Sequence, residues 1–213
     1  MIAAVAFDYG GVLTTPLRDS IAAWQTADGI DPVSFTQMLR DWLSRAGEND
    51  TPVHQLETGR LSAAEFDVLL AARLTTIGGR SVDPVGLLSR VFAAMRPDPA
   101  MFALASELRA LGVGVALLSN SWGNTYPRER LDALFDPVVI SGEVGLRKPL
   151  PPIYELTCER LGLPAQRVLF VDDAAPNVVG ARAVGMPALL HTDPVATRAA
   201  IAQWVPGLAN GAV

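Results

Sequence analysis

Three apolar runs of the chain each end abruptly in polar side chains that are capable of metal or phosphoryl chemistry. These side chains belong to Asp8, to the neighbours Ser119 and Asn120, and to the pair Asp172 and Asp173. An apolar run of this length is typical of a strand that is buried on both faces of a parallel sheet. Because the carboxyl ends of parallel strands meet at the edge where open α/β sheets bind ligands, we expect these side chains to lie close together.

The convergence of three carboxylates predicts a bound cation. Like charges at short range repel one another, and a hard divalent ion with oxygen ligands, for which we expect Mg²⁺, would remove that conflict. Lys148, in a loop at the same edge, would neutralise a substrate anion and keep Asp8 ionised. Ser119 and Asn120 would donate hydrogen bonds to phosphoryl oxygens. A nucleophilic carboxylate with these neighbours suits phosphoryl transfer through an aspartyl-phosphate.

Two glycines shape the backbone just after Asp8. Gly10 and Gly11 follow it after a single residue, at the end of the first apolar run. Glycines at such a position allow the chain to turn sharply and allow a ligand to approach the backbone closely.

Strand and helix patterns alternate along most of the chain. Strands are predicted at residues 3–7, 113–118, 138–140, 168–171 and 188–190, and helices at 99–111, 128–134 and 152–161, with a further helix ending at residue 183. This alternation predicts an α/β fold with a parallel sheet and right-handed crossovers.

The segment between the first two strands carries helical signals only. A proline after Asp31, a capping box that begins at Ser62 and the pair Asp83-Pro84 each indicate the start of a helix. We predict a compact insert of about four helices, at residues 17–95. Residues 1–16 and 96–213 would then form one core domain that is discontinuous in sequence.

Composition excludes several classes of partner. The formal net charge is −5 and the pI about 5.0, and the absence of a basic run argues against nucleic acid. No apolar segment reaches the roughly 18 residues that span a bilayer, and the N-terminus does not resemble a secretory leader. We therefore expect a soluble, cytoplasmic protein that acts on a small molecule and has no membrane partner.

Four motifs of the chain resemble, in order, those of the haloacid dehalogenase superfamily. They are Asp8-Tyr9-Gly10-Gly11-Val12, Leu117-Leu118-Ser119-Asn120-Ser121, Lys148-Pro149 and Phe170-Val171-Asp172-Asp173. The resemblance spans essentially the whole chain, and it implies a Rossmann-like core with an inserted helical cap of the first subfamily at residues 17–95. The sequence most resembles the branch that contains the phosphatase-like domain of soluble epoxide hydrolase. Members of that branch also tend to carry a tryptophan just after the second motif, as here at Trp122.

The resemblance assigns a role to each motif residue. It implies that Asp8 is the nucleophile and a metal ligand, and that Gly10 offers Mg²⁺ its backbone carbonyl. Asp173 would bind the ion directly, with Asp172 beside it or acting through water. Catalysis would also require Ser119 and Lys148, and the phosphoryl group would be bound by Gly11, Ser119, Asn120 and Lys148. The implied activity is Mg²⁺-dependent hydrolysis of a small phosphorylated metabolite.

Gly10 departs from the family pattern. The family's phosphatases usually carry a second aspartate at this position, which protonates the leaving oxygen and then activates water. Glycine keeps the backbone carbonyl and loses the acid–base group. The loss of such a group typically costs on the order of 10²- to 10⁴-fold in rate.

Three functions remain compatible with this pattern. The first is a Mg²⁺-dependent phosphatase that is slow or that uses substrates with good leaving groups. The second is a 2-haloacid dehalogenase, whose halide needs no proton, although those enzymes resemble Asp-x-Tyr-Gly-Thr in the first motif and lack the aspartate pair found here at Asp172 and Asp173. The third is a non-catalytic homologue that binds a phosphorylated ligand or a partner.

Overall fold

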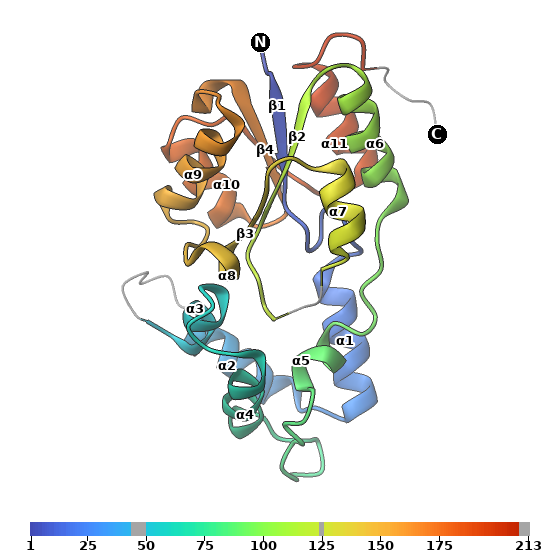
Figure 1. Cartoon of the computed structure of the whole chain (residues 1–213). Coiled ribbons are helices and arrows are strands. Elements are labelled where there is room, and N and C mark those ends of the chain that lie inside the picture. Colours follow the sequence, from blue (N-terminus) through green and yellow to red (C-terminus); the bar gives the residue numbers. More distant parts are fainter. Residues whose placement is uncertain (44–49, 124–125, 209–213) are drawn as a thin grey trace.

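The computed structural model describes residues 1–43, 50–123 and 126–208, and in them five parallel strands form one sheet. The strand order is β3-β2-β1-β4-β5, so the first strand lies at the centre of the sheet (Figure 1). The strands are β1 (Ala4–Phe7), β2 (Gly114–Ser119), β3 (Val138–Ile140), β4 (Val168–Asp172) and β5 (Ala188–Leu190). The predicted parallel α/β sheet is therefore confirmed, with strand bounds within two residues of those expected.

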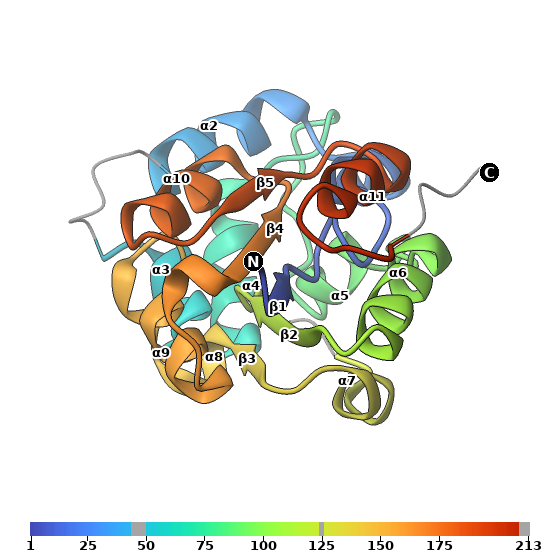
Figure 2. The same ribbon diagram turned by 90° about the horizontal axis from the view of Figure 1, so that it is seen from above.

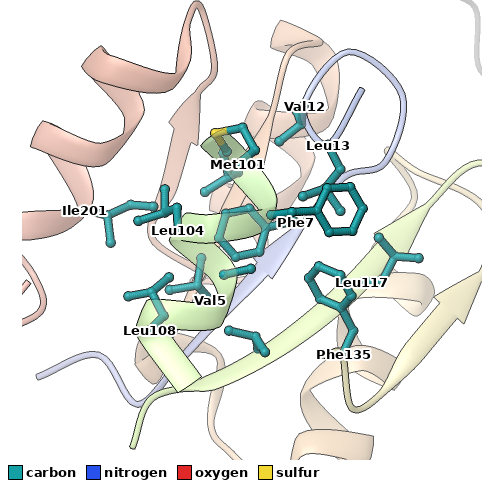
Figure 3. Packing of buried hydrophobic residues seen from close by; sticks show 14 of the residues in the cluster. Val5, Phe7, Val12, Leu13, Met101, Leu104, Leu108, Leu117, Phe135 and Ile201 are labelled. Atoms are coloured by element: carbon teal, nitrogen blue, oxygen red, sulfur yellow. The ribbon is translucent and has the colours of Figure 1, made fainter. Parts of the chain in front are cut away.

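Side chains of the central strands alternate between two apolar layers. Val5 and Phe7 of β1 belong to the layer shown in Figure 3, where they pack beneath Leu104 and Leu108 of α6 (Pro99–Ala110). Helices α7 (Arg128–Leu134) and α11 (Pro194–Ala202) cover the same face, as Figure 2 shows. Because the side-chain period of a strand is two, Ala6 faces the opposite layer.

That opposite layer is built by helices α9 (Pro151–Leu161) and α10 (Ala175–Ala183), with the short helix α8 (Ser141–Val144) at its end (Figure 2). Pro151 begins α9 and Gly162, at φ 65°, ends it. Helix α10 packs tightly against the loop that precedes α9, because a Cβ on Gly180 would lie 2.5 Å from the carbonyl oxygen of Pro149. Only glycine allows this approach. The loop that carries Lys148 is thereby held between the two helices.

Five short helices follow β1 in sequence and precede α6. In Figure 1 they lie below the carboxyl edge of the sheet. They are α1 (Leu17–Asp28), α2 (Pro32–Trp42), α3 (Pro52–Glu57), α4 (Ala63–Arg73) and α5 (Leu87–Val91). Their apolar side chains form a cluster of their own, which includes the fully buried Phe66 and Leu87. The expected caps are confirmed: Asp31 accepts from the first amides of α2, and Ser62 forms a complete capping box with Glu65.

Two details of this helical layer differ from expectation. The described residues contain five helices here rather than about four, because α1 precedes the first predicted start. The Asp83-Pro84 pair does not begin a helix: Gly86 adopts φ 63°, and α5 starts only after it, at Leu87. A residue in the left-handed region cannot lie inside a helix. That residues 17–95 form a separate domain stays a prediction.

No helix in the described part of the chain combines the length and the apolar character that crossing a membrane requires. The cytoplasmic location expected from the sequence stays a prediction.

Candidate active site

Strand register places the polar ends of β1, β2 and β4 at one level. Phe7 lies beside Leu117 of β2 and Val171 of β4, and the amide of Asp8 donates to the carbonyl of Val171 at 2.9 Å. Asp8 is therefore level with the next residue of β4, Asp172, and with Leu118 of β2. The convergence expected from the sequence follows directly from this register.

Lys148 joins these strand ends. Its ammonium lies 2.7 Å from Oδ1 of Asp8, 2.6 Å from Oδ2 of Asp172 and 3.1 Å from the carbonyl oxygen of Leu118. An ammonium group has three N–H donors, so these three acceptors match its donors. Lys148 is also the only lysine in the chain and is 1% exposed. The compact ammonium fits a three-sided set of acceptors that a planar guanidinium does not match.

Burial dominates the electrostatics of this group. It raises the pKa of Asp8 to about 7, with Asp172 adding to the rise and Lys148 opposing it. The two neighbouring carboxylates outweigh desolvation at Lys148 and raise its pKa above the ordinary value. Lys148 thus stays charged, and it favours the ionised form of Asp8 that a nucleophile requires.

Three carboxylates of this edge form a group that fits a metal ion. One ligand atom from each of Asp8, Asp172 and Asp173 lies within 4.8 Å of the others. Asp173 is exposed, whereas Asp172 is fully buried and accepts from the side chain of Asn177 at 3.1 Å. Burial, and the charge of Asp172 after it, raise the pKa of Asp173. All donors are carboxylate oxygens, which suits Mg²⁺ and not a soft metal.

The two glycines after Asp8 have different surroundings. Gly11 adopts φ 77°, and a Cβ there would lie 2.3 Å from Oδ2 of Asp173, so any side chain at Gly11 would collide with the carboxylate group. At Gly10 the φ angle is not in the left-handed region, and no described atom apart from its chain neighbours lies within 4 Å of a Cβ built there. Gly10 therefore has room for a side chain, whereas Gly11 does not.

Ser119 and Asn120 follow β2 at the same edge but have different partners. The hydroxyl of Ser119, which is buried, lies 3.0 Å from that of Tyr126. The side chain of Asn120 holds the backbone of Lys148: its amide nitrogen donates to the Lys148 carbonyl at 3.0 Å, and its oxygen accepts from the Lys148 amide at 2.9 Å. Asn120 thus supports the lysine loop here, and its direct bond to a phosphoryl group stays a prediction.

Two contacts of the site were missed by reasoning from the sequence. Asn177 orients Asp172 from the first turn of α10, and Tyr126 meets Ser119 from the loop before α7. The position of Asn177, five residues after the strand-end carboxylate, was a usable signal. Tyr126 carried none, because the loop between β2 and α7 has no periodicity. A second usable signal was the single lysine of the sequence, at position 148.

Comparison with known proteins agrees with this geometry. Residues 2–185 match the family model described as haloacid dehalogenase-like hydrolase. The chain is 29% identical to a sesquiterpene phosphatase of Aspergillus oryzae over 95% of this chain and 96% of the relative. It is 34% identical to a phosphatase of Mycobacterium tuberculosis over 89% and 87% of the two chains. The predicted similarity to the epoxide hydrolase branch is confirmed by rat bifunctional epoxide hydrolase 2, at 25% identity over 88% of this chain and 36% of that protein.

The fold recurs in a solved structure. A haloacid dehalogenase family enzyme of Bacteroides thetaiotaomicron, crystallised with magnesium and inorganic phosphate, superimposes with a TM-score of 0.65 at 20% identity and covers 90% of this chain and 95% of its own. The match of the family model to most of the chain, on top of the four motifs, the parallel sheet and the carboxylate group, establishes the relationship. The chain belongs to the haloacid dehalogenase-like hydrolase family.

Proposed function

We propose that this hydrolase is a Mg²⁺-dependent phosphatase that transfers the phosphoryl group of a small substrate to Asp8. The observation that carries the proposal is the arrangement of Asp8 at the sheet edge, 2.7 Å from a buried lysine and within a group of three carboxylates. The phosphatase names of two relatives support the same chemistry. The related enzyme crystallised with magnesium and phosphate supports the choice of ion and ligand.

The oxygen ligands for Mg²⁺ would come from Asp8, Asp173 and the carbonyl of Gly10, with Asp172 beside them. When bound, the ion would offset the negative charge of the carboxylates and of the phosphoryl oxygens. The close grouping of hard oxygen donors fits this ion. Lys148 would keep Asp8 ionised and positioned from the other side.

The chemistry then proceeds on the protein's own residues. A carboxylate oxygen of Asp8 attacks phosphorus, the bond to the leaving oxygen breaks, and an aspartyl-phosphate forms. Water next attacks that phosphorus and the bond between phosphorus and the Asp8 oxygen breaks. Hydrogen phosphate leaves with one proton of the water, the other proton passes to solvent, and the Asp8 carboxylate is restored. Ser119 would donate a hydrogen bond to a phosphoryl oxygen. The amide of Gly11, which donates to the hydroxyl of Thr14 at 3.0 Å, would donate to the phosphoryl group on exchanging that partner. Because Gly10 supplies no proton, substrates whose leaving group departs as a stable anion are favoured.

The helical layer would act as the cap that selects the substrate. Helices α1 to α5 lie at the carboxyl edge of the sheet, beside the strand ends (Figure 1). In such folds the chemistry belongs to the site and the choice of substrate to its surroundings. We therefore assign substrate selection to residues 17–95.

Metal removal tests the proposal. We expect p-nitrophenyl phosphate to be hydrolysed with Mg²⁺, to be spared in excess EDTA, and to be hydrolysed again when Mg²⁺ is restored. The Asp8→Asn variant should hydrolyse no ester, whether Mg²⁺ is present, removed or restored, because the amide is not a nucleophile. Halide release from a 2-haloacid without metal would instead indicate a dehalogenase. Phosphate binding with no hydrolysis of any ester would indicate a non-catalytic homologue.

A further inference from the structure

A buried carboxylate outside the reacting group connects the helical layer to the lysine loop. Glu57 is the last residue of α3 and is 6% exposed. Helix α3 lies against α8 at the carboxyl edge of the sheet, as Figure 1 shows. Burying a carboxylate without a partner costs free energy, so the partners of Glu57 indicate its role.

Within the described residues, the side chain of Glu57 contacts two partners, and both belong to the motif loops of the sheet. The indole nitrogen of Trp122 donates to Oε1 at 3.0 Å, and a guanidinium nitrogen of Arg147 lies 3.6 Å from Oε2. Burial raises the pKa of Glu57, and Trp122, Arg147, Asn120 and Lys148 oppose that rise.

One of these partners, Arg147, also bonds to the backbone of Lys148, which Asn120 holds as well. Asn120 bonds to both its amide and its carbonyl, and Arg147 donates to the same carbonyl at 3.3 Å. The carboxylate of Glu57 is thus two contacts away from the backbone of the lysine that holds Asp8.

We propose that Glu57 is a positioning residue for Lys148: through Arg147, it fixes the loop that directs the ammonium at Asp8. The functional consequence rests on the phosphatase activity proposed above. The contact makes part of the helical layer a component of the catalytic geometry, in addition to its role in substrate selection. A displacement of about 1 Å at such a site can cost on the order of 10²-fold in rate.

The backbone of Glu57 offers a matched control. The hydroxyl of Ser141 donates to the carbonyl of Glu57 and accepts from the amide of Ser121, so it joins α3 to the sheet without touching the Glu57 side chain. Ser141→Ala removes a docking contact, whereas Glu57→Gln removes the charge that orders Arg147. A second control is Arg60→Gln, three residues after Glu57, which breaks the exposed ion pair between Arg60 and Asp50.

The solitary lysine makes the test specific. Protein labelled with ¹⁵N-lysine gives one backbone amide signal, that of Lys148, whose amide donates to Asn120. We expect Glu57→Gln to shift this signal and to speed its hydrogen exchange, while Arg60→Gln and Ser141→Ala leave it in place. In the p-nitrophenyl phosphate assay, Glu57→Gln should lower kcat by about 10-fold or more and change KM much less.

Each outcome decides the proposal. An unchanged Lys148 amide signal in Glu57→Gln overturns it. A shift of that signal in Ser141→Ala as large as the shift in Glu57→Gln also overturns it, because docking alone would then explain the effect. Unchanged kcat alongside a shifted signal overturns the catalytic consequence. If the wild-type protein hydrolyses no ester, the phosphatase proposal fails, and the amide signal alone still tests whether Glu57 positions Lys148.

Discussion

Gly10→Asp is expected to raise turnover of p-nitrophenyl phosphate and of poorer leaving groups, the latter by about 10²- to 10⁴-fold. The added carboxyl group can protonate the leaving oxygen and then remove a proton from the attacking water. The position accepts a side chain without strain, because its φ is not left-handed and no described atom outside its chain neighbours lies within 4 Å of the new Cβ. The measurement is kcat for a series of esters with leaving groups of rising pKa.

Gly10→Asn is the matched control for this gain. The amide has nearly the same size and cannot transfer a proton in the same way, so it should leave turnover at or below the wild-type value. The gain in Gly10→Asp should grow with the pKa of the leaving group, since poorer leaving groups need the proton more. Equal rates for the aspartate variant and the wild type across the series would show that the missing acid does not limit this enzyme.

Lys148→Met is expected to lower kcat/KM by about 10²- to 10³-fold. The substitution removes the cation that contacts Asp8 at 2.7 Å and Asp172 at 2.6 Å. It also leaves two buried carboxylates without their partner, so the free energy of unfolding should fall by about 3–5 kcal/mol. Denaturant unfolding measures the second effect, and steady-state kinetics on the folded variant measure the first.

Lys148→Arg separates charge from geometry. It keeps the positive charge, so it should be more stable than Lys148→Met, but its planar guanidinium does not match the three acceptors of the ammonium. Activity should therefore stay well below that of the wild type. A folded Lys148→Met protein with wild-type activity would remove Lys148 from the mechanism.

The sequence predicts most of the sheet because each central strand is a continuous apolar run. A run buried on both faces admits few alternatives, and its carboxyl end fixes where the following polar residue lies. Asp8 and Asp172 were therefore predictable as neighbours. The helix starts at Asp31 and Ser62 were also readable, since a capping side chain acts on amides only two or three residues away.

Contacts between distant segments were not readable in the same way. Glu57 meets Trp122 and Arg147 only because α3 docks on the sheet edge, and no local pattern specifies that docking. The start of α5 depended on the left-handed backbone of Gly86, which overrode the Asp83-Pro84 signal. The bonds between the side chain of Asn120 and the backbone of Lys148 likewise join distant segments, and no local pattern specifies them.

The most direct test of the central claim is mass spectrometry of the enzyme quenched in acid during turnover. Because Gly10 supplies no base to activate water, the aspartyl-phosphate should break down slowly and accumulate. We predict that the peptide containing Asp8 gains the mass of one phosphoryl group at that residue, and that Asp8→Asn shows no gain. Continued release of phosphate by the wild-type enzyme with no phosphoryl group on Asp8 at any time of quenching would contradict the account.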